Sequence, residues 1–492
     1  MISLQVTNNQ RFNLSDIPFF EKDMFCAAVS EGLSAGYRML ALFPLDKNSP
    51  HQIVAVLADD ESALLQVTGG EFITDNLEFM SFAERFPQTN FFECELMENH
   101  GFHPLSHPWL RPVRQQSMIL GNQPYNFYKM SGDEVHEVAV GPIHAGVIEP
   151  GHFRFQCHGE MVYHLEINLG YQHRGVEKLM LNDSPVQRII LAESIAGDTT
   201  VAHTLAHCIA VEQLSEIQVS LRAQVIRAIA EELERIAMHI AGLGGIANDI
   251  GLAIASSSYG RLRTLVINSM AALCGSRFGR GLLIYGGVRF DFKPVIIKQI
   301  ISNLDTVKKD LLIINNFMFS ATSALNRFNE TGIVSTEFAR QIGLVGMAAR
   351  SCGLELDTRT NFPYGAYHYF PISTQTLITG DVFARAKLRE LEINESFRFI
   401  AEQLSNLPQG EIKAVAGKMA ADSAVISLTE GWRGEVMHMA ITDSDGKFKQ
   451  YKIKDPSFNN WYGLGLALRQ TAISDFPLCN KSFDLSYAGH DL

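Results

Sequence analysis

The pattern of apolar and polar residues divides this chain into two regions. In the first region, short apolar runs at 39–43, 53–57 and 64–67 follow a stretch at 23–32 that has helical spacing. Runs of four or five apolar residues bounded by polar positions are typical of buried strands. Residues 1–117 are therefore predicted to form a small α/β domain.

The pattern changes after this region. A polar segment at 118–137, which contains Gly121 and Pro124, predicts a linker. Residues 138–166 have strand-like runs, and apolar residues recur at spacings of three and four through 187–215 and 218–250, as in packed helices. Residues 138–492 are therefore predicted to be a mainly α-helical domain with a β-rich entry, which makes the whole chain an α+β protein.

Composition narrows the function classes. The 492 residues are 46% hydrophobic, which is enough for sizeable cores, and the net charge of -12 argues against nucleic-acid binding, which needs a basic surface. The N-terminus lacks a basic segment followed by an apolar run, and apolar stretches fall short of the roughly 20 residues that span a bilayer. We expect a cytoplasmic protein with no transmembrane segment of its own.

The cysteines are scattered and form no C-x-x-C pair. Clustered thiolates are the usual ligands of structural zinc and iron–sulfur sites, so reduced, buried thiols are expected instead. The seven cysteines lie at positions 26, 94, 157, 208, 274, 352 and 479.

Two motifs carry a specific resemblance. The tail D-L-S-Y-A-G-H-D-L at 484–492 resembles the D-P-C-x-x-C-x-D-R sequence that closes the large subunit of nickel–iron hydrogenases. The segment A-G-D-T-T-V-A-H-T at 196–204 resembles C-G-x-C-G-x-A-H-S of the energy-converting, membrane-bound group. Four residues replace the cysteines of these motifs, namely Ala196, Thr199, Ser486 and Gly489. Since nickel and iron need thiolate ligands there, the resemblance implies a hydrogenase relative without its metal, not an active hydrogenase.

Further motifs extend the resemblance to respiratory complex I. The sequence F-F-E-C-E-L-M-E-N-H-G at 91–101, followed by H-P-W-L-R-P at 107–112, is similar to the signature of the 30 kDa subunit. The sequence L-G-Y-Q-H-R-G-V-E-K-L at 169–179 is close to a motif that hydrogenases share with the 49 kDa subunit. The chain thus resembles a fusion of the two subunits, as in formate hydrogenlyase and hydrogenase-4.

The resemblance assigns candidate proton groups. Glu177 matches the glutamate that passes protons to the metal in hydrogenases, although an ion pair with Arg174 is an equal alternative. His152, in the E-P-G-H turn at 149–152, matches a histidine that binds a quinone headgroup in complex I; the alternative is a structural hydrogen bond.

The segment around 197 departs from both parent families. Gly197 stands where complex I has its quinone-binding tyrosine, so a quinone reaction is in question. Asp198 could transfer protons, or Asp198 or Thr199 could cap the following helix. The metal or quinone cavity implied by the resemblance is lined by His152, Gly197, Thr199 and Ser486.

Further charged and histidine residues have either a catalytic or a structural interpretation. Arg433 is a candidate positive partner for an anionic intermediate. His203 and His207 share a helix face and could chelate zinc, but a packed or hydrogen-bonded pair is expected. Charged groups inside apolar helices, such as Arg235, Arg389 and Glu392, are expected to form arginine–carboxylate pairs of the scaffold.

Together these features predict the large subunit of a membrane-associated, ion-translocating oxidoreductase complex with electron transfer of the NADH:quinone oxidoreductase kind. The resemblance implies an iron–sulfur small subunit as electron donor, antiporter-like membrane subunits as partners, quinone as the possible acceptor, and a peripheral place on the inner face of the cell membrane. The alternative is a non-catalytic adaptor that docks the iron–sulfur subunit onto the membrane subunits. A polar cavity around residues 152, 197 and 486 would favour the first, and a filled one the adaptor.

Overall fold

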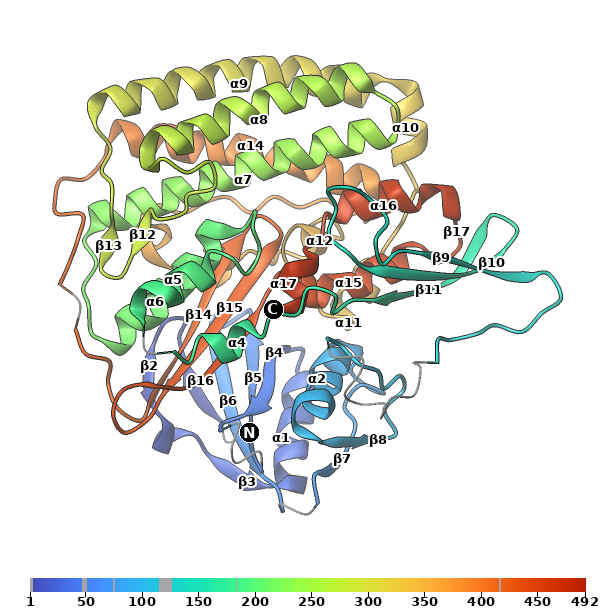
Figure 1. Cartoon of the computed structure of the whole chain (residues 1–492), viewed down its shortest axis with the longest axis vertical. Helices are drawn as coiled ribbons and strands as arrows, with labels where there is room; N and C mark the ends of the chain where they lie inside the picture. Colours follow the sequence, from blue (N-terminus) through green and yellow to red (C-terminus); the bar gives the residue numbers. More distant parts are fainter. Residues whose placement is uncertain (1–2, 47–50, 74–75, 115–125, 183, 416) are drawn as a thin grey trace.

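The computed structural model describes residues 3–46, 51–73, 76–114, 126–182, 184–415 and 417–492. Helices and strands occupy different regions of the molecule, with the N-terminal sheet at the bottom of Figure 1 and a layer of long helices at the top. The predicted α+β fold, with a small N-terminal α/β part and a mainly helical remainder, is confirmed.

The N-terminal sheet contains the three predicted strands in the order β1-β6-β5-β4, and β3 joins it as a parallel neighbour of β6. Its strands are β1 (Leu4–Val6), β3 (Phe19–Glu21), β4 (Arg38–Pro44), β5 (Gln52–Asp59) and β6 (Leu64–Glu71). The predicted helix is α1 (Lys22–Ser34), and α1 and α2 (Asn90–His100) cover one face of the sheet. Both faces of the sheet are buried, which explains why β5 reads as a continuous apolar run.

The second face of this sheet packs against another sheet far along the chain. Val54 and Val56 of β5 share a core with Met437 and Met439 of β15. The second sheet has the order β16-β15-β14-β2, and β2 comes from the N-terminal region. Its strands are β2 (Arg11–Asn13), β14 (Ser423–Gly431), β15 (Gly434–Thr442) and β16 (Phe448–Lys454). Residues of both predicted domains thus contribute to this core. The boundary predicted at residue 117 lies outside the described residues.

The helical layer is formed by α7 (Leu221–Asp249), α8 (Ala253–Cys274), α9 (Pro294–Ser320) and α14 (Val382–Ser405) (Figure 1). The helix predicted at 218–250 is α7, which begins where the Ser220 hydroxyl accepts a hydrogen bond from the Ala223 amide. The helical stretch predicted at 187–215 is two helices, α5 (Pro185–Ala192) and α6 (Thr200–Leu214). The segment between them, 193–199, contains the first four residues of the hydrogenase-like motif at 196–204, whose remaining residues lie in α6.

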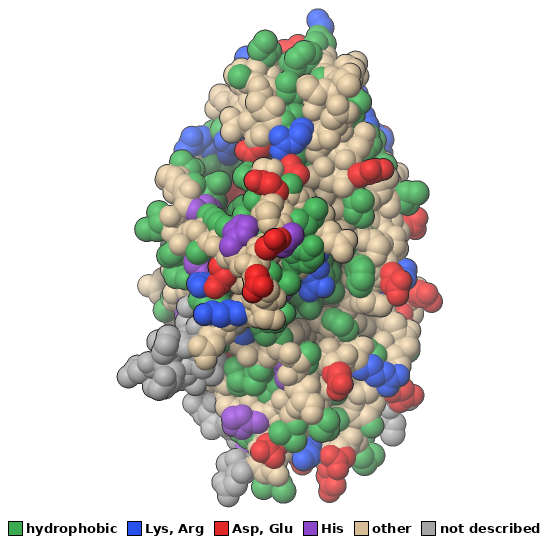
Figure 2. All heavy atoms as spheres, turned by 90° about the vertical axis from the view of Figure 1, so that its right-hand side faces the viewer, with side chains coloured by type: hydrophobic (Ala, Val, Ile, Leu, Met, Phe, Trp, Pro, Cys, Tyr) green, Lys and Arg blue, Asp and Glu red, His purple; other side chains and the backbone are tan. Residues whose placement is uncertain are grey.

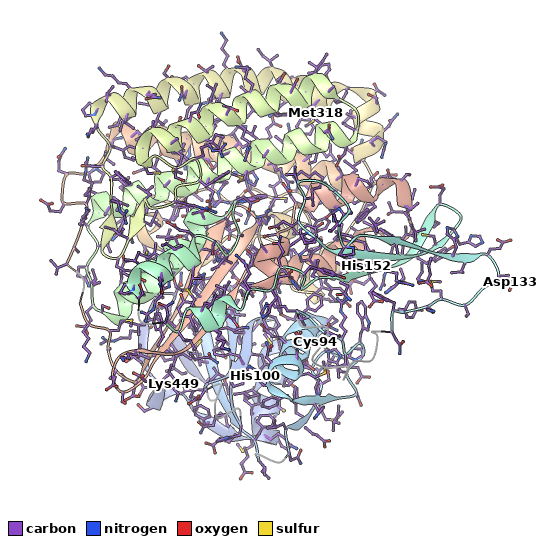
Figure 3. All side chains as sticks on the ribbon, in the orientation of Figure 1. Cys94, His100, Asp133, His152, Met318 and Lys449 are labelled. Atoms are coloured by element: carbon purple, nitrogen blue, oxygen red, sulfur yellow. The ribbon has the colours of Figure 1, made fainter. Side chains whose placement is uncertain are left out.

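A further antiparallel sheet, with the order β17-β11-β10-β9, leads into the helical region as predicted. Its strands are β9 (Val135–Val140), β10 (His152–His158), β11 (Met161–Asn168) and β17 (Thr471–Ala472). The β9–β10 ribbon projects at the right of Figure 1, with Asp133 near its tip in Figure 3. Figure 2 looks onto this side, where histidines lie among side chains of both charges. Of the predicted linker at 118–137, residues 118–125 lie outside the described residues, and β9 already begins at residue 135.

The remaining elements are short, apart from one helix of twelve residues. They are η1 (Leu14–Asp16), β7 (Glu78–Met80), η2 (Pro87–Thr89), β8 (His103–Leu105), α4 (Val176–Leu179), β12 (Leu283–Ile284), β13 (Gly287–Val288), α10 (Thr322–Phe328), α11 (Thr336–Gln341), α12 (Gly346–Arg350), α13 (Thr358–Asn361), η3 (Gly365–His368), α15 (Pro456–Ala467), η4 (Ile473–Asp475), α16 (Phe476–Phe483) and α17 (Tyr487–Asp491). None of the helices in the described ranges has the length and apolar character needed to cross a membrane. All seven cysteines are free thiols, and Cys26 and Cys274 are only half-buried.

Candidate functional site

Arg433 joins the two hydrogenase-like motifs. Its Nη1 and Nη2 atoms donate to the two carboxylate oxygens of Asp198 at 2.6 and 2.7 Å. Nη1 also donates to the Thr199 hydroxyl at 3.0 Å, and Nε donates to the carbonyl of Asp484 at 2.5 Å. Asp198 and Thr199 of the first motif and Asp484 of the C-terminal tail therefore meet at one arginine.

The Arg433–Asp198 pair is asymmetric in its exposure. The Arg433 side chain is 5% exposed, whereas that of Asp198 is 37% exposed. Burial alone lowers the pKa of the Arg433 guanidinium, but Asp198 and Asp484 raise it above its ordinary value, so the side chain stays charged. A fixed cation thus lies beneath a carboxylate that reaches the solvent.

The predicted helix cap at Asp198 or Thr199 is wrong. Neither side chain caps α6, whose Val201 and Ala202 amides donate instead to the carboxylate of Glu234 on α7. Burial raises the pKa of Glu234 to about 8, despite these two backbone hydrogen bonds. Asp198 is thereby free to pair with Arg433.

The four positions that correspond to cysteines are engaged in other contacts. Ala196 is buried, and Thr199 receives the hydrogen bond from Arg433. The Ser486 hydroxyl accepts from the Gly489 amide at 2.9 Å and so caps α17. A Cβ atom on Gly489 would lie 2.5 Å from Cγ of Asp455.

Glu149 is a second carboxylate at this place, to which sequence reasoning gave no role. It follows β9 in the turn that contains His144, and its Oε2 accepts from the Tyr487 and Ala488 amides, both at 3.2 Å. Burial first, and then the charge of Asp198, raise the pKa of Glu149. The E-P-G-H turn at 149–152 is the sequence feature that could have identified Glu149, but a role was assigned only to its histidine.

A pocket with about 1350 Å³ of empty space adjoins the tail. Its wall includes His144 and Ile148 from the β9–β10 turn, and Lys481, Asp484 and Tyr487 from the C-terminal region. His144 Nε2 lies 3.4 Å from the Tyr487 hydroxyl, and Lys481 pairs with Asp484 at 2.7 Å. The pocket therefore combines an apolar wall with a histidine, a phenol and an ion pair.

The other sequence-predicted residues do not join the Arg433–Asp198 site through their side chains. His152, labelled at the base of the ribbon in Figure 3, packs against Phe127 with ring centroids 5.2 Å apart, and its Nε2 atom is buried with no partner among the described residues. Glu177 accepts the Ile453 amide and pairs with Lys452 at 3.1 Å, not with Arg174. Gly197 is exposed, and a Cβ atom there would approach only Arg280. His152, Glu177 and Gly197 are thus not brought into contact with Asp198 through their side chains.

His203 and His207 form hydrogen bonds, as expected. His203 contacts Asp455 at 2.9 Å and His438 at 3.1 Å, while His207 contacts the hydroxyls of Tyr451 and Tyr285. In the described part of the chain, no group of three or more His, Cys, Asp or Glu side chains is arranged to hold a metal ion. The Asp455–His203 contact also fixes the carboxylate that lies against Gly489.

A buried ionic network supports the site from the helical layer. Arg350 pairs with Glu392 and Glu430, and Arg359 pairs with Asp357 and Glu232, which confirms the expected arginine–carboxylate pairing for these groups.

Arg389 differs from Arg350 and Arg359. Its Nε and Nη2 atoms are buried without a partner in the described residues, and burial lowers its pKa to about 10, although Asp484 opposes this. Hydrogen-bonding capacity therefore remains unused beside Asp484.

Comparisons with known proteins identify relatives of this chain. Residues 249–426 match the family model of the respiratory-chain NADH dehydrogenase 49 kDa subunit. Formate hydrogenlyase subunit 5 of Escherichia coli is 28% identical over 84% of this chain and 77% of its own length. The membrane-bound hydrogenase subunit alpha of Pyrococcus furiosus is 28% identical over 71% of this chain and 85% of its own length.

A solved structure shows the same fold. A chain from the membrane-bound sulfane sulfur reductase, an archaeal respiratory membrane complex, superposes with a TM-score of 0.69 at 23% identity. The match covers 74% of this chain and all of that one.

Proposed function

Since this chain carries a complex I 49 kDa-like domain and is a homologue of formate hydrogenlyase subunit 5 and of membrane-bound hydrogenase large subunits, we propose that it is the large subunit of a membrane-associated, ion-translocating oxidoreductase complex without a nickel–iron centre. The observation that carries the proposal is the meeting of residues 198 and 199 with the tail at Arg433, beside a mainly apolar pocket. That pocket is lined by other residues than the predicted His152, Gly197, Thr199 and Ser486.

A nickel–iron centre does not fit the residues present. Ala196, Thr199, Ser486 and Gly489 supply no thiolate, and nickel–iron chemistry needs soft donors. The Thr199 and Ser486 hydroxyls are already hydrogen-bonded within the protein, and Asp455 lies in the space beside Gly489. No step of the proposed reaction therefore passes through such a metal.

The proposed reaction moves electrons from an iron–sulfur cluster of a partner subunit to an acceptor in the pocket lined by His144 and Tyr487. Quinone is the acceptor that the resemblance to complex I implies. Arg433 lies behind the pocket wall, where it binds the Asp484 carbonyl, and from there would stabilise negative charge on a reduced acceptor. Asp198, paired with Arg433, and Glu149, bonded to the Tyr487 amide, would supply protons through the same wall. Asp198 is the sequence-predicted proton group whose contacts adjoin the pocket, whereas His152 and Glu177 contact other partners.

The names of the relatives support the proposed partners. Their names describe membrane-bound hydrogenases and respiratory membrane complexes. We infer that this chain lies at the inner face of the cell membrane, held there by an iron–sulfur subunit and by antiporter-like membrane subunits.

A non-catalytic adaptor is the second candidate function. The specific observation in its favour is the ion pair of Arg433 with Asp198, which satisfies the buried cation without any ligand. In an adaptor this pair would only hold the tail to residues 198 and 199.

The test uses the complex purified through this subunit. Nickel and iron are measured, and the partner cluster is reduced and followed by electron paramagnetic resonance with and without a menaquinone analogue. Iron without nickel, together with reoxidation of the cluster by the quinone, is the expected result. Stoichiometric nickel would overturn the proposal.

The variant Arg433→Gln separates the two functions. It should slow reoxidation of the cluster in an assembled complex, because the acceptor loses its positive partner. The matched control is Arg277→Gln, an exposed arginine packed against Phe278 in another region, which should leave the rate unchanged. No quinone response in the unaltered complex, with Arg433→Gln affecting only assembly, would favour the adaptor.

A further inference from the structure

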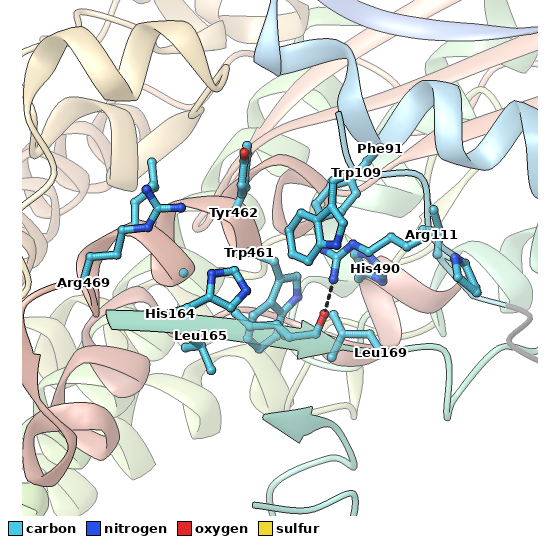
Figure 4. A pocket seen from close by; sticks show the side chains of 15 residues that line it. Phe91, Trp109, Arg111, His164, Leu165, Leu169, Trp461, Tyr462, Arg469 and His490 are labelled. Carbon is cyan, nitrogen blue, oxygen red and sulfur yellow. Dashed lines mark hydrogen bonds between the residues drawn. The ribbon is translucent and has the colours of Figure 1, made fainter. Parts of the chain in front are cut away.

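A second pocket lies where the N-terminal domain meets β11 and α15 (Figure 4). It spans about 680 Å³, part of which is open to solvent, and it is separate from the pocket of His144 and Tyr487. Several rings and two arginines line it, namely Phe91, Trp109, Arg111, His164, Trp461, Tyr462, Arg469 and His490. The H-P-W-L-R-P motif at 107–112 supplies two of these residues, for which the proposed function has no use.

The rings of this pocket are held in place by one another. Trp109 and His164 meet edge to face with centroids 5.8 Å apart, and Tyr128 packs on the outer side of His164 at 4.6 Å. The Arg111 guanidinium lies 4.0 Å from the Trp109 ring centroid and 5.0 Å from that of Phe91. Flat, preorganised ring surfaces favour a flat guest.

The charge of the pocket is positive. Arg111 is 7% exposed, and its Nη1 atom donates to the Ile167 carbonyl while its Nε atom has no partner among the described residues. Arg469 is exposed, and within the described ranges its guanidinium makes no ion pair. No aspartate or glutamate is among the lining residues, although the charge of Glu166 acts on His164. An anion in the pocket would therefore meet more positive than negative charge.

His164 adds an unused polar atom. Its Nε2 is buried with no hydrogen-bond partner in the described residues, and burial, opposed by the charge of Glu166, lowers the pKa of the ring, which favours the neutral form. A neutral imidazole can donate from this atom to a ligand oxygen. An unpartnered nitrogen beside an arginine without an acidic partner is the arrangement that a bound carboxylate would satisfy.

We propose that this pocket binds a small planar aromatic carboxylate of one or two rings, with the ring among Trp109, Trp461 and Tyr462 and the carboxylate held by Arg469 and His164, which lie on the same side of the pocket in Figure 4. This ligand site goes beyond the proposed electron transfer and does not depend on it. The Trp461 indole in its wall also donates to the Ser486 carbonyl and packs on Tyr487 at 4.8 Å. An occupant would therefore contact a residue that supports the tail of the electron-transfer site.

The test is isothermal titration calorimetry of the full chain with 2-naphthoate, and with 2-naphthamide as the neutral analogue of the same shape. Naphthoate should bind and naphthamide should bind at least about fivefold more weakly, as expected for losing one charge-assisted hydrogen bond. Two of the three tryptophans, Trp109 and Trp461, line the pocket, so tryptophan fluorescence should change on binding.

Arg469→Gln tests the pocket at an exposed position where folding is not at stake. It should weaken naphthoate binding by about fivefold and leave naphthamide binding unchanged. Arg277→Gln is the control, since it removes an exposed arginine beside a ring elsewhere and should alter neither. Equal affinity for the two compounds, no binding of naphthoate, or an effect of Arg277→Gln equal to that of Arg469→Gln would each overturn the proposal.

Discussion

Asp455 lies against Gly489 so closely that the glycine has no room for a side chain. The carboxylate is held there by His203 at 2.9 Å and by the Ser457 amide at 2.8 Å, while a Cβ atom on Gly489 would come within 2.5 Å of Asp455 Cγ. The last of the four positions that correspond to cysteines is therefore closed by a second side chain as well as by its own substitution.

Gly489→Cys should destabilise the protein by about 1–3 kcal/mol, because the new side chain must displace Asp455 in a well-packed region. Ser486→Cys is the matched control: it keeps the size of the side chain, so it should cost less, about 1 kcal/mol for a weakened cap. Differential scanning calorimetry of both variants measures the difference. Equal melting temperatures for the two would show that the space at Gly489 is not closed.

The Asp198–Arg433 pair should couple in stability. A double-mutant cycle with Asp198→Asn and Arg433→Gln in urea unfolding should give a coupling energy of about 1–3 kcal/mol, because either single change leaves a buried charge or donor unpaired. The control pair is Arg261–Asp310, whose side chains are 56% and 31% exposed; its coupling should stay below about 1 kcal/mol. Equal coupling energies in the two pairs would contradict the conclusion that burial of Arg433 strengthens its ion pair with Asp198.

Glu234 should make stability fall as pH rises. Its pKa is raised from 4.5 to about 8 in the folded protein, so between these values the folded state holds a proton that the unfolded state has lost. Its contribution is complete below about pH 4.5 and is lost as pH rises towards 8. Glu234→Gln, which stays neutral, should therefore lose less stability between pH 5 and pH 8 than the wild type, by about 2 kcal/mol or more.

The measurement for Glu234 is urea unfolding at several pH values across this window. Glu61→Gln is the control, because Glu61 is exposed, and its pH dependence should follow the wild type. A wild type and a Glu234→Gln variant with parallel curves would show that Glu234 is already ionised at pH 7.

Gly242 on α7 provides space for the side chain of Arg389 on α14. A Cβ atom there would lie 2.6 Å from Arg389 Nε and 3.2 Å from an Asp484 oxygen. Gly242→Ala should therefore destabilise by about 1–3 kcal/mol, although alanine normally favours a helix over glycine by up to about 1 kcal/mol. Gly260→Ala on α8 meets no atom within 4 Å and should stabilise instead, as thermal unfolding of the two variants can show. A stabilised Gly242→Ala would contradict the close contact.

The sequence alone determined much of the fold. Continuous apolar runs predicted β4, β5 and β6 because both faces of that sheet are buried, and the 3.6-residue period predicted α7. It did not show that Val56 and Met437 would share a core, because a local pattern does not identify the partner of a buried face. A helix start after residue 198 or 199 was expected, but its stabilising contacts were not, because Asp198 and the first amides of α6 bind Arg433 and Glu234, which are distant in the chain.

For the candidate site, the motifs at 196–204 and 484–492 told which segments belong together, and the types of their residues told that thiolates are missing. Only the tertiary structure decided which side chains meet there. It brought Arg433 to Asp198, Glu149 to the start of α17, and His144, in place of His152, to Tyr487. Contacts of this kind depend on the packing of whole elements, so spacing along the chain determines the kinds of residue available and the fold determines their partners.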